Sequence, residues 1–224
     1  MNRRAFVIGT GAGIMALPFV PRLSTAPAWE PRPRTAEQRR RRMFPNVTLR
    51  AHNGRELHFY DDLVKNKTVL LHFMYTRCRD GLCLPTVANL ARVEAALGGR
   101  VGRDVFMYSI TLDPRHDTPD RLKAFRAHFT RNPGWIFLTS DQPQRIERLR
   151  RRLGYVDRDP LRDADPASHV GHVTIGVERL ERWCSAPARL RAGAIKNYLC
   201  WMEPDGERPT PWMLAGSGRK IRVS

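Results

Sequence analysis

Two stretches of the chain are almost continuously apolar, and they predict the central strands of a sheet. Residues 69–75 (VLLHFMY) and 105–112 (VFMYSITL) contain few polar side chains. Such runs are typical of strands that are covered on both faces. Their β-branched and aromatic content predicts shorter strands at residues 47–49, 57–59, 135–138 and 169–175.

Apolar residues three and four positions apart predict helices between these strands. Leu90, Val93 and Leu97 share one face of a helix that follows a loop after the first central strand, and Gly98 ends it. Strands that alternate with helices predict an α/β fold with crossover connections. Further helices are predicted at 119–129, 146–153 and 187–202, and polar connections at 60–67 and 156–168.

The first 28 residues have the pattern of an export signal. Arg3 and Arg4 precede a moderately apolar segment, and Ala26-Pro27-Ala28 is a small-x-small cleavage site. The sequence NRRAF is similar to a twin-arginine signal. We therefore expect an exported, periplasmic protein. The alternative is an uncleaved segment that keeps the protein at the membrane, although glycine and proline interrupt it and a span needs about 20 apolar residues.

The remaining chain divides by composition. Residues 29–44 are rich in proline and arginine without apolar periodicity, and they predict a flexible basic linker. Residues 45–203 form the expected α/β domain, and 204–224 carry no pattern and predict a C-terminal tail. A chain of 224 residues is long enough for one such domain with a substantial core.

The formal net charge of +17 allows attraction to nucleic acid or to an anionic membrane surface. The arginines are scattered over helical faces, with one dense run at residues 39–42, and the sequence has neither zinc-finger spacing nor a basic region with heptads. An exported protein also has little access to nucleic acid. We therefore expect solvated helical faces and a basic surface that approaches a membrane, and no nucleic-acid partner.

Cys78 and Cys83 lie between the first central strand and its helix. The thiolate is both the nucleophile and the metal ligand, and a helix N-terminus lowers the pKa of a thiol beside it. Cys83 is predicted at that N-terminus, and Arg77 and Arg79 flank Cys78. Soft sulfur ligands select soft ions such as Cu(I). The pair is thus a candidate copper site or a candidate redox pair; its C-x4-C spacing is less specific than C-x-x-C.

Three blocks of the sequence resemble the Sco/SenC family in the family's order. They are FYDDLVKNKTVLLHFMYTRC, LDPRHDTPDRLKAF and SHVGHVTIG, and the resemblance covers about residues 45–175. It implies a thioredoxin-like domain, with a central mixed sheet flanked by helices. It also implies a copper chaperone that delivers a copper ion to the dinuclear copper site of cytochrome c oxidase, with the copper-bearing subunit of the oxidase as its partner.

The resemblance implies that Cys78, Cys83 and His169 bind the copper ion, and that Asp113 supports the site. The sequence departs from the family pattern in two places. Four residues separate the cysteines where the family commonly has three, and Leu84 stands where the family has proline. Ser168 precedes the histidine where aspartate is frequent.

The other histidines and cysteines have competing interpretations. His172 is the rival of His169; on one strand the two side chains would point to opposite faces. His72 lies inside a central strand and is expected in the core. Cys184 and Cys200 are either a second disulfide or two buried free thiols.

Two functions compete for the cysteine pair. The first is an exported copper chaperone, not a turnover enzyme, in which Cys78, Cys83 and His169 hold one ion. The second is a thiol-disulfide oxidoreductase that keeps the cysteines of a partner reduced, with Cys78 and Cys83 as its redox pair. A basic nucleic-acid binder is the third and least supported class.

Overall fold

The computed structural model describes residues 35–78, 81–169 and 171–203. The described residues all belong to one compact unit. The predicted export signal (1–28) and C-terminal tail (204–224) lie outside the described residues. Among the helices of the described segments, none combines the length and the apolar character that crossing a membrane requires.

A single mixed sheet of seven strands forms the centre of this unit, in the order β2-β1-β5-β4-β3-β6-β7. The three central strands β3, β4 and β5 are parallel, and β1, β2, β6 and β7 pair antiparallel at the two sides. The strands are β1 (Thr48–Ala51), β2 (Glu56–His58), β3 (Thr68–Met74), β4 (Val105–Thr111), β5 (Trp135–Thr139), β6 (His172–Val177) and β7 (Arg182–Pro187).

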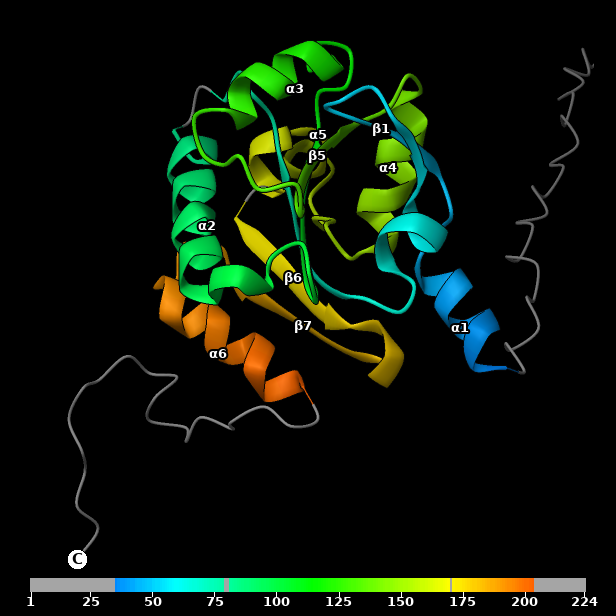
Figure 1. Ribbon diagram of the computed structural model, residues 1–224. Helices are drawn as coiled ribbons and strands as arrows, with labels where there is room; N and C mark the ends of the chain where they lie inside the picture. The colour runs from blue at the N-terminus through cyan, green and yellow to red at the C-terminus, as the bar shows by residue number, and fades with distance from the viewer. Residues whose placement is uncertain (1–34, 79–80, 170, 204–224) are drawn as a thin grey trace, which may run out of the picture. The chain divides into compact units, whose positions relative to one another are not determined.

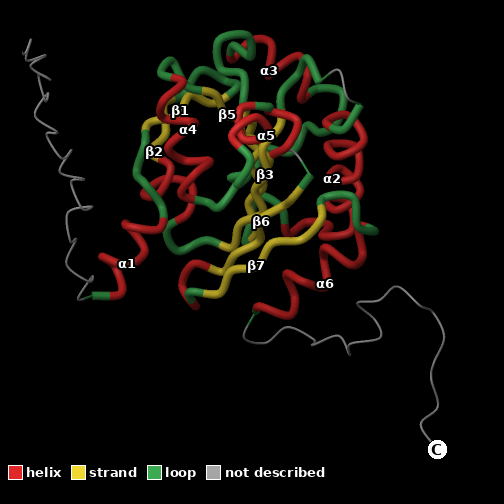
Figure 2. The backbone as a smooth tube through the Cα atoms, turned by 180° about the vertical axis from the view of Figure 1, so that it is seen from behind, coloured by secondary structure: helices red, strands yellow, loops and turns green. Residues whose placement is uncertain are grey.

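Helices cover both faces of the sheet (Figures 1 and 2). α2 and α6 pack side by side on one face, and the π-helix η1 and α4 bury their apolar residues against the other. The helices are α1 (Ala36–Met43), η1 (Phe59–Val64), α2 (Cys83–Leu97), η2 (Gly98–Arg100), α3 (Pro119–Arg126), α4 (Pro143–Arg152), α5 (Pro160–Ala164), η3 (Pro166–His169), η4 (Glu178–Leu180) and α6 (Ala192–Met202).

β3 contributes apolar side chains to the two hydrophobic cores, one on each face of the sheet, as expected for a strand that is covered on both faces. Leu70 and Met74 face the core under α2 and α6, while Leu71 and Phe73 face the core under η1 and α4. All four are at most 1% exposed. The predicted α/β class, with a central mixed sheet flanked by helices, is therefore confirmed.

The structure differs from the expected linker at residues 36–43, which form helix α1. Thr35 and Gln38 build a capping box at its start. Arg40 Nε pairs with Glu181 (3.1 Å) and with the buried Glu178 (3.4 Å). Phe44, 1% exposed, packs on Trp183 with 4.4 Å between ring centroids. These partners lie more than 130 positions away in sequence, so local periodicity did not reveal the helix.

Further elements were missing from the expectation, and one of them is α5 (Pro160–Ala164), which lies in the segment 156–168 that was expected as a polar connection. Residues 60–67 were expected as a polar connection, yet most of that segment is η1, which buries Phe59, Tyr60, Leu63 and Val64. Strand β7 follows a tight turn in which Glu181 has a positive φ of 51°. The strand expected at 169–175 begins instead at His172, and His169 belongs to the 3₁₀ turn η3 before it.

Candidate functional site

The cysteine loop connects the end of β3 to the start of α2. Cys83 is the first residue of α2 and is 1% exposed, whereas Cys78 is half-buried. The backbone N–H of Cys83 donates to Cys78 Sγ at 3.3 Å. The free N–H groups and the dipole of a helix N-terminus favour a negative charge at that sulfur. The structure thus places the two thiols side by side, with Cys78 as the more accessible.

The prediction that the helix start lowers the pKa of Cys83 is wrong. Burial raises the pKa of Cys83, and the hydrogen bond that its thiol gives to Cys78 raises it further. Burial also opposes ionisation of Cys78, but hydrogen bonds from the thiol and backbone of Cys83, from Tyr75 and from Leu82 lower the pKa of Cys78 overall. Of the two thiols, Cys78 is therefore the one more readily ionised, because the helix N-terminus points at its sulfur and not at that of Cys83.

A fully buried carboxylate, Asp117, supports the start of the loop. It accepts hydrogen bonds from the backbone N–H of Thr76 (3.0 Å), from the Thr76 hydroxyl (2.5 Å) and from the Thr111 hydroxyl (2.5 Å). His116 Nδ1 lies 2.9 Å from the same carboxylate. Asp117 joins the ends of β3 and β4, and its charge raises the pKa of Cys83.

Sequence reasoning pointed to Asp113 and missed Asp117. Asp113 Oδ2 pairs instead with Arg77 Nη2 at 2.7 Å, at the partly exposed rim of the loop. The available signal for Asp117 was its position directly before Thr118-Pro119, where Thr118 caps α3. From the sequence, the Arg77 guanidinium was expected to favour the thiolate of Cys78. In the structure it forms an ion pair with the Asp113 carboxylate instead.

The predicted third ligand, His169, lies in a different set of contacts. Its ring is 4% exposed, and Arg150 Nη1 lies 2.9 Å from His169 Nε2. The Asp163 backbone carbonyl lies 3.0 Å from the same nitrogen. A hydrogen bond from Arg150, itself buried, holds the pKa of the Asp163 carboxyl well below its usual range.

The structure brings the two cysteines together but does not add His169 to them. Among the residues that the structure describes, no group of three or more histidine, cysteine, aspartate or glutamate side chains is arranged to hold a metal ion. Ligation of one ion by Cys78, Cys83 and His169 therefore stays a prediction. The two sulfurs alone fit a soft ion, because they are adjacent, unpaired in any disulfide and partly open.

The other candidate histidines and cysteines either have a structural role or take no part in the candidate site. His72 is fully buried, and its Nε2 forms a hydrogen bond with the Ser109 hydroxyl (2.7 Å), whose oxygen also accepts from Trp135 Nε1 (2.8 Å). His72 is thus a core residue, as expected. His172 begins β6 and is exposed. Cys184 and Cys200 are free thiols, so no disulfide joins β7 to α6.

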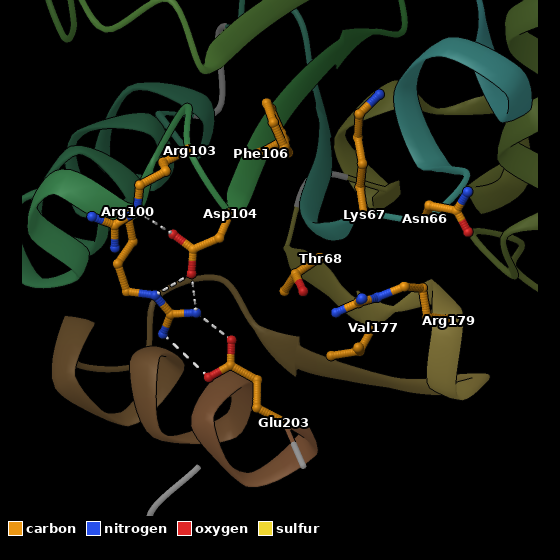
Figure 3. Close-up of a pocket in the computed structure, with 10 residues that line it drawn as sticks. All are labelled: Asn66, Lys67, Thr68, Arg100, Arg103, Asp104, Phe106, Val177, Arg179 and Glu203. Atoms are coloured by element: carbon orange, nitrogen blue, oxygen red, sulfur yellow. Dashed lines mark hydrogen bonds and ion pairs between the residues drawn. The ribbon is translucent and has the colours of Figure 1, made fainter. Parts of the chain in front are cut away.

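A cavity of about 470 Å³ lies at the opposite edge of the sheet, where β3 and β4 begin and β6 ends (Figure 3). Arg100 lines it and pairs with both Asp104 and Glu203, so that opposite charges meet within the cavity. Its described lining residues include neither cysteine nor histidine. The cavity therefore offers no ligand for a soft metal, and the candidate site remains the cysteine loop.

An α/β domain with two adjacent thiols between a central strand and the following helix defines a thioredoxin-like protein with a redox-active or metal-binding cysteine pair. The SCO1/SenC family model matches residues 36–175. The chain belongs to the SCO1/SenC family, which confirms the family resemblance of the sequence.

Individual relatives agree with this assignment. A protein of Stutzerimonas stutzeri that is named for copper binding is 28% identical over 138 residues, which are 61% of this chain and 65% of the relative. The chain thus spans slightly less than two thirds of that relative's length.

Solved structures confirm the thioredoxin-like fold. A SCO1/SenC family lipoprotein from Bacillus anthracis has a TM-score of 0.59 at 21% identity, covering 71% of this chain and 94% of that one. BsSco, described as a member of the Sco family of cytochrome c oxidase assembly proteins and as containing a disulfide switch, has a TM-score of 0.53 at 20% identity, covering 68% and 88%.

Proposed function

We propose that this protein is an exported copper chaperone that binds one copper ion through Cys78 and Cys83, with His169 as the third ligand. The observation that carries the proposal is the pair of adjacent free thiols at the start of α2. Family membership and the relative named for copper binding support copper as the ion. Copper here is cargo, and the protein is not a turnover enzyme.

The proposed recipient is the copper-bearing subunit of cytochrome c oxidase. BsSco, a structural neighbour, is described as a member of a family of oxidase assembly proteins, which supports this recipient. Transfer would proceed by ligand exchange, in which the partner's thiolates enter as Cys78 and Cys83 leave. A half-buried Cys78 gives the partner access to one sulfur while Cys83 stays protected.

Export to the periplasm, with or without retention at the membrane, belongs to the same proposal. It rests on the sequence of residues 1–28, and the Bacillus anthracis neighbour is a lipoprotein, which agrees with a location outside the cytoplasm. Fractionation of cells that express the full chain tests it: we expect the protein in the periplasmic or membrane fraction, and recovery in the cytoplasm alone would contradict export.

The test of copper binding is a Cu(I) titration of the reduced full chain against a chromophoric chelator, without oxygen. We expect about one Cu(I) per chain, and a loss of affinity of about 100-fold or more in Cys78→Ser and in Cys83→Ser, because each removes one soft ligand. Cys184→Ser is the matched control and should bind as the wild type does. Equal binding by all three variants would refute the cysteine site.

A thiol-disulfide oxidoreductase is the second candidate, and the lowered pKa of Cys78 favours it. The Cys78 thiolate would attack a partner disulfide and release one partner thiolate, and Cys83 would then resolve the mixed disulfide. The partner would gain two thiols while this protein gains a Cys78–Cys83 disulfide. Reduction of a model disulfide that is insensitive to His169→Ala, in a protein that binds no copper, would favour this function over the first.

A further inference from the structure

The imidazole of His169 is held by a buried guanidinium. Arg150 Nη1 lies 2.9 Å from His169 Nε2 and 3.5 Å from Nδ1, so a cation faces the edge of the ring that bears both nitrogens. Both side chains are almost completely buried, at 3% and 4% exposure. The Asp163 carbonyl, 3.0 Å from Nε2, can only accept, so Nε2 carries the ring hydrogen and donates it there. Both hydrogens of Nη1 go to Asp163 Oδ1 and the Tyr155 carbonyl, so Arg150 faces the ring as a cation.

Arg150 is fixed by other groups. Its Nη1 and Nη2 contact the two oxygens of Asp163 at 2.8 and 3.1 Å, and its Nε and Nη2 contact the two oxygens of Glu147 at 2.9 and 2.8 Å. Nη1 also donates to the Tyr155 carbonyl at 2.5 Å. Bidentate pairs of this kind are strong and geometrically restrictive. If the contact between Arg150 and His169 is to break, the histidine must therefore move.

A ring nitrogen that carries a hydrogen and donates it has no free lone pair, so Nε2 in this position cannot bind a metal ion. The positive charge of Arg150 also opposes a cation at that nitrogen. We propose that Arg150 is a positioning residue that holds His169 in a copper-free position, so that copper and Arg150 compete for the same imidazole. The resting protein then presents only the two thiols, and His169 joins them after it leaves Arg150.

The departure of His169 from Arg150 should cost little free energy. When His169 leaves, Nη1 keeps Asp163 Oδ1 and the Tyr155 carbonyl as acceptors, so no buried donor is left without a partner. His169 ends the four-residue turn η3 and stands three positions before β6. Since β6 pairs antiparallel with β3, this turn and the cysteine loop lie at the same edge of the sheet.

The consequence is two states that differ in the position of His169. In the resting state Arg150 holds it, and in the copper-bound state it is the third ligand. Return of His169 to Arg150 would remove one of three copper ligands and so favour transfer of the ion to a partner. The inference rests on the proposed function, because it concerns how the same site acquires its third ligand.

A matched pair of substitutions tests it. Arg151 contacts the same two carboxylates as Arg150, with Nε 2.5 Å from Glu147 and Nη2 2.8 Å from Asp163, and it is 56% exposed. Arg150→Met and Arg151→Met therefore remove the same charge from the same carboxylates, but only the first is designed to release His169. We expect Arg150→Met to raise the Cu(I) affinity about tenfold and Arg151→Met to leave it within about twofold.

The same measurement in the His169→Ala background gives a readout that a general structural effect would not change. The tenfold gain should vanish there, because the gain acts through the imidazole. A gain that persists without His169, or equal effects of the two arginine variants, would overturn the inference while leaving copper binding intact. Absence of Cu(I) binding in the wild type would refute the proposed function, and the inference with it.

Arg150→Met removes a buried group, so a measurement on the wild type stands beside it. Nuclear magnetic resonance of the full chain, with labelled histidine and arginine, should show contacts between the Arg150 guanidinium and the His169 ring without copper. One equivalent of Cu(I) should remove these contacts and shift the His169 ring nitrogens. Contacts that survive with the His169 nitrogen bound to copper would overturn the inference whether or not the variant folds.

Discussion

Two loops lie at the same edge of the sheet, and they differ in how far their side chains are already placed for metal binding. The cysteine loop between β3 and α2 already holds its two sulfurs together, with the Cys83 N–H 3.3 Å from Cys78 Sγ. The η3 turn before β6 holds its histidine against Arg150. The first arrangement needs only a helix start and two residues five positions apart. The second depends on a residue 19 positions away, so a local pattern cannot reveal it.

The charges beneath the two loops are also opposite. A carboxylate, Asp117, is buried under the cysteine loop and accepts from two threonine hydroxyls and one backbone N–H. A guanidinium, Arg150, is buried beside the η3 turn and donates to two carboxylates. Each buried charge is satisfied, as the cost of an unpaired one requires. Asp117 stabilises the loop that it supports, whereas Arg150 engages the side chain that the site would use.

The largest effect should come from removing the buried carboxylate. Asp117→Ala leaves the Thr76 N–H and the Thr76 and Thr111 hydroxyls without their acceptor. We expect the free energy of unfolding to fall by about 4 kcal/mol, the range for breaking a buried charged network. Urea denaturation measures it. Asp113→Ala is the control: it removes one partly exposed ion pair and should cost less than about 1 kcal/mol. Equal losses would mean that Asp117 does not support the loop.

A smaller effect should come from the buried His72. Burial lowers the pKa of His72 to about 4, from an ordinary 6.5. The unfolded chain takes up a proton as the pH falls through 6.5, and the folded chain does so only near pH 4. Stability is therefore lost as the pH falls between these values, by about 3 kcal/mol from this residue. Burial also lowers the pKa of His52 to about 4, which acts in the same direction.

Urea unfolding at pH 7, 5.5 and 4.5 checks the prediction, and His72→Gln should flatten the pH dependence. His58→Gln is the control, since that side chain is exposed on the outermost strand. A slope that is unchanged in His72→Gln would show that His72 does not stay neutral in the folded protein.

The sequence predicted the sheet centre and the cysteine loop because both leave a local signal. The continuous apolar run of β3 follows from burial on two faces. In α2, the apolar residues recur three and four positions apart because only one face of the helix is buried. The position of Cys83 at the start of α2 was predictable from the same boundary, although the sulfur that benefits from the helix N-terminus is that of Cys78.

The parts that the sequence missed depend on distant partners. α1 is polar along its length, and its support is the buried Glu178 together with Glu181 and the ring of Trp183 beside Phe44. Arg150 lies in a run of three arginines at the end of α4, yet only Arg150 is buried. Its burial depends on Asp163, on Tyr155 and on His169, and no spacing rule connects these residues.

The two thiols should differ in reactivity. The pKa of Cys78 is lowered and that of Cys83 is raised, so at pH 7 Cys78 has the larger thiolate fraction and is also more exposed. We expect iodoacetamide to modify Cys78 at least about tenfold faster than Cys83. Mass spectrometry of peptides after brief labelling over pH 5–9 measures both rates. In Cys83→Ala the labelling curve of Cys78 should move to higher pH, because the hydrogen bond from the Cys83 thiol is lost.

The smallest effect concerns Arg77, whose place beside Cys78 in the sequence suggests that it activates the thiol. Its Nη2 pairs instead with Asp113 at 2.7 Å, which neutralises much of its field at the sulfur. Arg77→Gln should therefore change the Cys78 labelling rate at pH 7 by less than about twofold. A tenfold drop would mean that the arginine acts on the thiolate directly, and that the cysteine loop, like the η3 turn, depends on a neighbouring guanidinium. The expected result leaves the helix N-terminus and the Cys83 thiol as the groups that stabilise the Cys78 thiolate.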